Sequence, residues 1–268
     1  MIVCFTGTGN SRAVALRLAE RLGDGFYMIE GEAASAPSAV ASLGLRPEDK
    51  GRVIWVFPVY SWGVPPVVAR FIREVGVSES FARAEHRMVC TCGDDAGMTD
   101  RVFRRLIEDR GWKCEPEAFS VIMPNTYTLM KGFDVDNPEV RKAKLDAMPA
   151  VVERIAGMIE GREEMRPMFV SGGFARLKTG IVYPWFKRFA MSPKPFRSTG
   201  ACTVCGTCAR KCPLGNITMT ADGPQWGANC ALCLRCYHVC PRHAVAYGKA
   251  TDGKGQYLCP PRNCPPDN

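Results

Sequence analysis

Short apolar runs alternate with amphipathic segments over residues 1–160 of the chain. An alternation of this kind predicts a parallel sheet with helices on both faces, an α/β domain. The runs that predict strands are Met1–Phe5, Phe26–Ile29, Arg52–Val59, Arg87–Thr91 and Phe119–Met123. The segments with helical spacing are Asn10–Leu22, Pro65–Val75, Met98–Arg110 and Pro138–Ile159, the last with Asn137 as its N-cap.

The character of the chain changes after Gly161. No acidic residue occurs from Met165 to Ala221, and aromatic residues concentrate over residues 169–196. Prolines 184, 193 and 195 are expected to break any long helix there. We therefore divide the chain into a domain over 1–160, a basic aromatic connection over 161–198, a cysteine-rich domain over 199–249 and a Gly/Pro-rich tail over 250–268. The tail is expected to be loosely ordered.

Composition excludes several classes of protein. Of the 268 residues, 46% are hydrophobic and 23% are charged, which argues against disorder. No stretch of about 18 apolar residues is free of charge, so no membrane-spanning helix is expected. The first residues carry no basic region typical of a secretory signal, and we expect a cytoplasmic location. The net charge of +8 arises entirely after residue 123, which suits either an anionic partner or anions that the protein itself binds.

Ten of the 14 cysteines lie between Cys202 and Cys264, and eight of them form a repeat. A run C-x2-C-x2-C-x3-C-P occurs twice, and each copy is the bacterial ferredoxin run for a [4Fe–4S] cluster. The fourth cysteine of each run ligates the other cluster in such proteins. The predicted ligand sets are Cys202, Cys205, Cys208 and Cys240 for one cluster, and Cys230, Cys233, Cys236 and Cys212 for the other.

Zinc is the main alternative, because C-x2-C pairs also bind zinc. Two identical four-cysteine runs, each followed by proline, favour iron–sulfur clusters. Residues 199–248 thus resemble a two-cluster bacterial ferredoxin of α+β fold. His238 lies between two predicted ligands, but the sets are complete without it, so a packing or surface role is expected. Cys259 and Cys264 match no cluster run and are expected to be free thiols, with a redox-active pair as the alternative.

A glycine loop, Thr6-Gly7-Thr8-Gly9-Asn10-Ser11, connects the first predicted strand to the first helix. Backbone N–H groups at such a helix start bind anions. The loop lacks the third glycine of a dinucleotide-binding motif, because residue 12 is arginine, and it lacks the lysine of a P-loop. It resembles instead the flavodoxin loop T-x-T-G-N-S/T, which holds the phosphate of FMN.

This resemblance implies a five-stranded doubly wound sheet of order 2-1-3-4-5, with FMN at the switch point between the first and third strands. The aromatic residues Tyr60 and Trp62 would then stack on the flavin, although one of them could instead pack on the sheet edge. Gly93 would let backbone amides approach the ring. Cys92 could lie near the flavin, a buried free thiol being the default. Residues 124–127 would complete the rim.

The chain as a whole resembles the flavodoxin–ferredoxin fusion proteins of anaerobic bacteria and archaea. That resemblance implies an electron-transfer protein that passes low-potential electrons between two [4Fe–4S] clusters and FMN, and on to a redox partner protein. Alternatives are an FMN-dependent reductase of a small molecule, and a redox sensor or membrane-docked regulator. No catalytic group stands out, so whether the protein is itself an enzyme stays open. The basic aromatic segment 165–199 is expected to pack the two domains together, with docking on a partner protein or a membrane surface as the less favoured alternative. We expect no nucleic-acid partner, since no binding motif is present.

Overall fold

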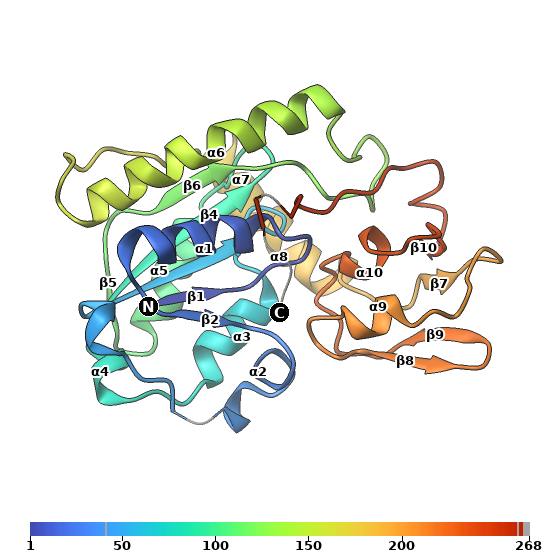
Figure 1. Cartoon of the computed structure of the whole chain (residues 1–268), viewed down its shortest axis with the longest axis horizontal. Coiled ribbons are helices and arrows are strands. Elements are labelled where there is room, and N and C mark those ends of the chain that lie inside the picture. Colours follow the sequence, from blue (N-terminus) through green and yellow to red (C-terminus); the bar gives the residue numbers. More distant parts are fainter. Residues whose placement is uncertain (41, 262, 265–268) are drawn as a thin grey trace.

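A parallel sheet forms the first part of the protein in the computed structural model, which describes residues 1–40, 42–261 and 263–264 (Figure 1). The strands run in the order β2-β1-β3-β4, and both β5 and β6 pair with β4. Since β5 and β6 pair with opposite ends of β4, together they fill the fifth position. The predicted flavodoxin-like order 2-1-3-4-5 is confirmed. The strand bounds are β1 Ile2–Cys4, β2 Phe26–Met28, β3 Arg52–Pro58, β4 Glu85–Cys92, β5 Lys113–Cys114 and β6 Phe119–Ile122.

Helices cover both faces of the sheet. Alternate residues of β3 point to opposite faces, so Trp55 packs in a core with α3 and α5, whereas Ile54 packs in a second core with α1 and α6. Asn137 caps α6 as predicted, because its Oδ1 accepts the N–H of Val140 at 2.8 Å. The helix bounds are α1 Asn10–Leu22, α2 Glu32–Ser35, η1 Pro37–Ala39, η2 Pro47–Asp49, α3 Pro66–Glu74, α4 Glu79–Ala82, α5 Thr99–Glu108 and α6 Pro138–Ile159.

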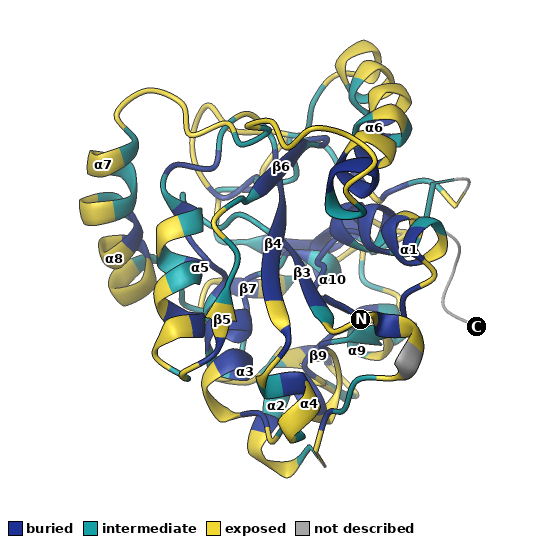
Figure 2. Cartoon of the chain, turned by 90° about the vertical axis from the view of Figure 1, so that its left-hand side faces the viewer, coloured by how far each residue is buried: buried dark blue, intermediate teal, exposed yellow. Residues whose placement is uncertain are grey.

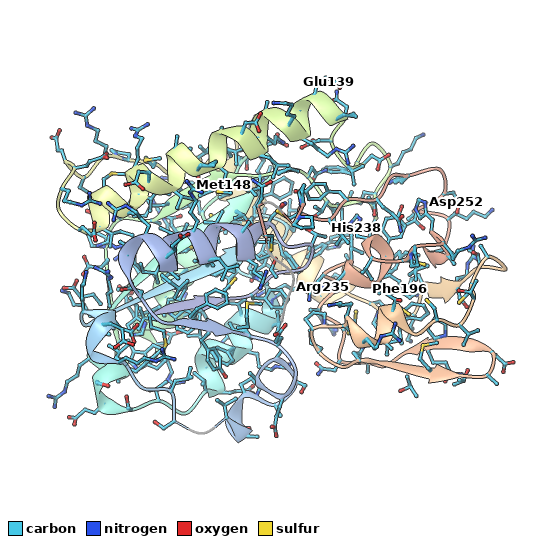
Figure 3. The ribbon with its side chains drawn as sticks, in the orientation of Figure 1. Glu139, Met148, Phe196, Arg235, His238 and Asp252 are labelled. Atoms are coloured by element: carbon cyan, nitrogen blue, oxygen red, sulfur yellow. The ribbon has the colours of Figure 1, made fainter. Side chains whose placement is uncertain are left out.

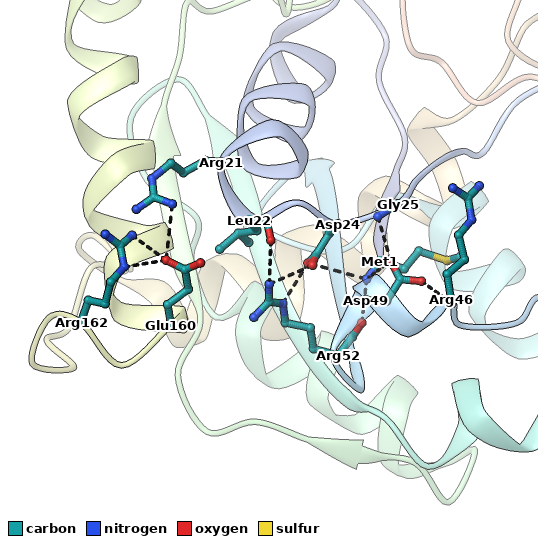
Figure 4. Close-up of polar contacts among 10 residues, drawn as sticks. All are labelled: Met1, Arg21, Leu22, Asp24, Gly25, Arg46, Asp49, Arg52, Glu160 and Arg162. Carbon is teal, nitrogen blue, oxygen red and sulfur yellow. Dashed lines mark hydrogen bonds and ion pairs between the residues drawn. The ribbon is translucent and has the colours of Figure 1, made fainter.

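A buried group of charges lies at the amino end of the sheet (Figure 4). The amino group of Met1 lies 3.0 Å from Oδ1 of Asp49 and 3.7 Å from Oδ2 of Asp24. Arg52 donates two hydrogen bonds to Asp24, at 2.8 and 2.9 Å. Neither carboxylate side chain is exposed to solvent. Each charge is therefore compensated inside the fold, as buried charges must be.

An Asp49→Ala substitution is expected to lower the free energy of unfolding by about 3 kcal/mol, because it leaves the terminal amino group with less buried compensation. Burial alone would raise the pKa of Asp49, but hydrogen bonds from the amides of Arg46 and Gly25 and from the amino group outweigh it, so the pKa is lowered. Urea denaturation measures the change. As a control, Glu79→Ala removes an exposed ion pair with Arg83 and should cost less than about 0.5 kcal/mol. Equal losses in the two variants would contradict the prediction.

The connection between the two parts of the protein contains a helical run over residues 175–190. It consists of α7 Ala175–Leu177, the π segment η3 Lys178–Val182, α8 Tyr183–Trp185 and the π segment η4 Phe186–Ala190. The expectation that Pro184 breaks a long helix is therefore wrong. The π turn before the proline widens the helix, which accommodates the ring and the carbonyl that has lost its donor.

The cysteine-rich part consists of two short antiparallel ribbons and two short helices (Figure 1). One ribbon pairs β7 with β10, and the other pairs β8 with β9. Each cysteine run contains one of the two helices. The bounds are β7 Phe196–Ser198, α9 Thr207–Arg210, β8 Ile217–Thr220, β9 Gly223–Trp226, α10 Arg235–His238 and β10 Val245–Tyr247. Within the described part of the chain, no helix is long and apolar enough to cross a membrane.

Candidate functional site

A cavity of about 240 Å³ opens at the carboxyl ends of the strands. The loops after β1, β3, β4 and β6 form much of its wall, because parallel strands all end at the same edge. Gly9, which was predicted to bind FMN, lies in the first of these loops and shapes its turn. The other residues with that prediction all line the cavity: Thr6, Gly7, Thr8, Asn10, Ser11, Tyr60, Trp62 and Gly93. The structure thus brings this set together.

The loop from Thr6 to Ser11 is suited to bind an anion. Gly9 has a φ of 99°, a left-handed conformation without steric cost for glycine. Its N–H donates to Oγ1 of Thr6 at 3.1 Å. The N–H groups of the first turn of α1 have no acceptor within the helix, and that turn contains no acidic residue. The positive end of α1 can therefore hold a phosphate at the cavity wall.

The C-terminal segment packs against this loop. The N–H of Cys259 donates to the carbonyl of Thr8 at 2.8 Å, and the hydroxyl of Tyr257 donates to Oδ1 of Asn10 at 2.8 Å. Tyr257 and Cys259 are buried. The expectation of a loosely ordered tail is therefore wrong for residues 250–261 and 263–264, because buried side chains and backbone hydrogen bonds tie them to the loop. The tail residues 262 and 265–268 lie outside the described part.

Cys259 and Cys264 lie beside Gly9. A hydrogen bond with Cys264, together with burial, raises the pKa of Cys259, so this group stays protonated. A guanidinium nitrogen of Arg12 lies 3.2 Å from Sγ of Cys264. Whether these two cysteines are thiols or a redox-active pair stays a prediction.

Tyr60 and Trp62 lie on a tight turn after β3. The N–H of Tyr60 donates to the carbonyl of Gly63 at 2.9 Å, and the N–H of Gly63 donates to the carbonyl of Tyr60 at 3.0 Å. Ser61 and Trp62 have φ values of 46° and 62°, as a type I′ turn requires. This conformation is rare for tryptophan and is held from outside the turn, where the hydroxyl of Thr179 donates to the carbonyl of Trp62 at 2.7 Å.

Tyr60 lies between the cavity and the second cysteine set. Burial raises the pKa of its phenol well above the ordinary value, and the thiols of Cys233 and Cys230 add to the rise. The phenol therefore remains uncharged. Its apolar ring also packs against the core of the cysteine-rich part. Tyr60 can thus contact a ligand in the cavity and the cysteine turn at once.

The loops after β4 and β6 are fixed by one lysine. Lys144 Nζ donates to the carbonyl of Gly93 and to Asp136, both at 2.8 Å. The same Asp136 carboxylate accepts the N–H of Asn125 at 2.9 Å. Cys92 lies in this wall, and burial raises its pKa to about 12, so it remains a thiol as expected. The four rim residues predicted over 124–127 all line the cavity.

The eight cysteines of the repeat line two small hollows of about 20 Å³ each. One hollow is lined by Cys202, Cys205, Cys208 and Cys240, and the other by Cys212, Cys230, Cys233 and Cys236. These are the two predicted ligand sets, including the exchange of the fourth cysteine between the runs. Among the described residues, no three His, Cys, Asp or Glu side chains converge closely enough to hold one metal ion. Cluster binding itself stays a prediction.

The glycine loop, Thr6–Ser11, and the second cysteine run are in direct contact. Nε of Arg235 donates to the carbonyl of Gly7 at 2.7 Å. A Cβ atom placed on Gly7 would lie only 2.6 Å from the carbonyl oxygen of Cys233. Nearby, Nε2 of His238 donates to the carbonyl of Thr126 at 2.8 Å, which confirms the packing role expected for this histidine. Arg235 and His238 lie on α10, at the junction of the two parts (Figure 3).

Several cavity residues were missed by the sequence analysis. The apolar pair Leu232 and Leu234 flanks Cys233 and reaches the cavity from the cysteine-rich part. Phe186 reaches it from the helical run over 175–190. The only sequence signal for these contacts was the apolar character of the residues within the second cysteine run. Periodicity could not show that this run folds against the sheet edge.

Comparison with known proteins gives no family assignment. No family model and no curated protein matches the chain. Similar solved structures include Treponema denticola general stress protein 14 with FMN (10% identity, 60% of this chain and 98% of that chain, TM-score 0.38). Fusobacterium nucleatum flavodoxin bound to FMN is 12% identical over 61% of this chain and 97% of that chain, with a TM-score of 0.36. An NADPH-quinone reductase from P. pentosaceus is 12% identical over 56% of this chain and 95% of that chain, with a TM-score of 0.31. Two of these three structures contain FMN, but the likeness is too low to support an argument.

Proposed function

We propose that this chain is an electron-transfer protein that binds one FMN in the cavity and one [4Fe–4S] cluster in each cysteine-lined hollow. The observation that carries this proposal is the position of Cys233, which lines both the cavity and the second hollow. A cluster bound in that hollow would lie directly beside a flavin in the cavity. Electrons could then pass between them without a second protein.

The cavity residues fit FMN. Thr6 and the first turn of α1 offer hydroxyl and N–H donors for a phosphate, and Tyr60 and Trp62 offer aromatic faces for a flat ring. Backbone carbonyls and amides of the loops around Gly93 supply polar contacts at the rim. Bound FMN exchanges one or two electrons, whereas the protein binds, orients and shields it.

The hollows fit iron–sulfur clusters because each combines four thiols with N–H donors aimed at sulfur. The backbone N–H of Asn216 lies 3.4 Å from Sγ of Cys212, and that of Ala244 lies 3.2 Å from Sγ of Cys240. The indole N–H of Trp226 lies 3.5 Å from Sγ of Cys236. Hydrogen bonds of this kind stabilise thiolate ligands and set cluster potentials.

Purification without oxygen, followed by iron, sulfide and flavin analysis, tests the proposal. We expect about eight irons, about eight sulfides and one FMN per chain, since two cubane clusters and one cavity are present. Zinc in place of iron, or a chain that binds iron but no flavin after incubation with FMN, would contradict it.

A second test distinguishes electron transfer from small-molecule reduction. Met130 and Phe133 line the cavity and are 53% and 42% exposed, so an apolar substrate could approach there. Reduced holoprotein is mixed without oxygen with quinones or nitroaromatics, and separately with an oxidised ferredoxin or flavodoxin. The proposal predicts rapid oxidation by the protein acceptors. Turnover with small molecules alone would favour the reductase.

A further inference from the structure

The helical run over residues 175–190 carries an apolar stripe on its outer side. Five large apolar side chains of the run and the residue before it are each at least half exposed: Phe174 (82%), Leu177 (51%), Ile181 (64%), Trp185 (57%) and Phe189 (66%). The run lies at the periphery of the molecule, and α7 and α8 are largely coloured as exposed (Figure 2). Large apolar side chains exposed together on a protein surface mark interaction sites.

The opposite side of the run is firmly anchored. Tyr183 and Phe186 are buried, and the hydroxyl of Tyr183 donates to the carbonyl of Val64 at 2.6 Å. The ammonium group of Lys178 forms an ion pair with Asp95 at 2.7 Å. The stripe is thus presented by a helix whose orientation is fixed by its inner face.

The π segments keep the stripe straight. The stripe residues from Leu177 to Phe189 recur every four positions, and in an α-helix each such step turns about 40° past one full turn. The stripe would therefore wind around an α-helix. Two five-residue π segments, Lys178–Val182 and Phe186–Ala190, have wider turns, which hold positions four apart on one side.

The charged residues of the run itself are all basic. Arg176, Lys187 and Arg188 are exposed on the same run, and no acidic residue occurs from Met165 to Ala221. We infer that this stripe docks on an anionic lipid bilayer, with the helix lying in the plane of the interface. A single helix with Trp, Phe, Ile and Leu on one side and a basic flank is the form of an interfacial helix.

Charge argues against a second copy of this chain as the occupant. A two-fold contact would bring the same stripe from both copies together, and with it Arg176, Lys187 and Arg188 of both. No acidic residue of the run could compensate them.

Sedimentation with sucrose-loaded vesicles tests the inference on anaerobically purified full-length holoprotein. Binding is expected to phosphatidylglycerol-containing vesicles at low salt, much less to pure phosphatidylcholine, and to fall with added salt. The double variant Trp185→Ser/Phe189→Ser should lose binding, whereas Val140→Ser/Leu258→Ser, which also removes two exposed apolar side chains, should bind as the wild type does.

A second pair of variants tests the charge. Arg176→Gln/Arg188→Gln should weaken binding about thirtyfold, because each basic residue near an anionic surface contributes about fivefold to the affinity. The control Arg101→Gln/Arg154→Gln removes the same two positive charges at exposed positions outside the run. It should bind the vesicles with the wild-type affinity. FMN content measured on each variant reports folding separately. The inference is overturned if the wild-type protein does not sediment with the vesicles at low salt. It is also overturned if Trp185→Ser/Phe189→Ser and Arg176→Gln/Arg188→Gln both bind as the wild type does. Binding to an acidic redox protein in place of vesicles would assign the stripe to that partner.

Discussion

A Gly7→Ala substitution is expected to raise the dissociation constant for FMN about thirtyfold, the effect of roughly 2 kcal/mol of steric strain. The added methyl group would lie 2.6 Å from the carbonyl oxygen of Cys233, a backbone atom that cannot move without shifting the cysteine run. Either the glycine loop or that run must give way, and both line the cavity. Fluorescence titration of the flavin-free protein with FMN, without oxygen, measures the change.

Gly173→Ala is the matched control. Gly173 has nothing within 4 Å of the position a Cβ would take, and like Gly7 it does not need a positive φ. Its FMN affinity should equal that of the wild type. An unchanged dissociation constant in Gly7→Ala would show that FMN binding does not depend on the contact between the glycine loop and the second cysteine run.

Pairs of cysteine substitutions are expected to separate the two clusters. Cys205→Ser combined with Cys240→Ser should retain about four irons per chain, because both residues line the first hollow. Cys205→Ser combined with Cys212→Ser should retain almost none, because Cys212 lines the second hollow. The first pair spans both runs and the second lies within one run, so the result distinguishes the exchanged ligand sets from one cluster per run.

Iron and sulfide analysis, with electron paramagnetic resonance of the reduced protein, provides the readout. FMN should remain bound in the first pair, since neither residue lines the cavity. Its flavin should also still accept electrons from the remaining cluster. If the pair within one run retained four irons and the pair across the runs lost all of them, the assignment of Cys212 and Cys240 would be wrong.

The sheet and the glycine loop could be predicted from the sequence because local patterns encode them. The apolar run at Arg52–Val59 and the helical spacing of Asn10–Leu22 specify their elements directly. The cysteine spacing likewise specified which thiols share a hollow. In each case the information lies within a few dozen residues.

The rest depends on contacts between distant segments. The hydrogen bond between Tyr257 and Asn10 joins residues 247 positions apart, and nothing in the composition of the tail indicates it. Pro184 was expected to break a helix because the rule for proline assumes α geometry, whereas π turns surround it here. The contact of Gly7 with Cys233 required the relative placement of two domains, which no periodicity contains.

The contact between the C-terminal segment and the glycine loop has a consequence for the order of assembly. The carbonyl of Thr8 accepts the N–H of Cys259, and Oδ1 of Asn10 accepts the hydroxyl of Tyr257. A nascent chain can fold its parallel sheet once α6 has left the ribosome, but its glycine loop stays without these partners until residues near 260 emerge. We therefore expect flavin to bind only after residues near 260 have been synthesised, onto a chain whose two cysteine runs are already available for cluster insertion.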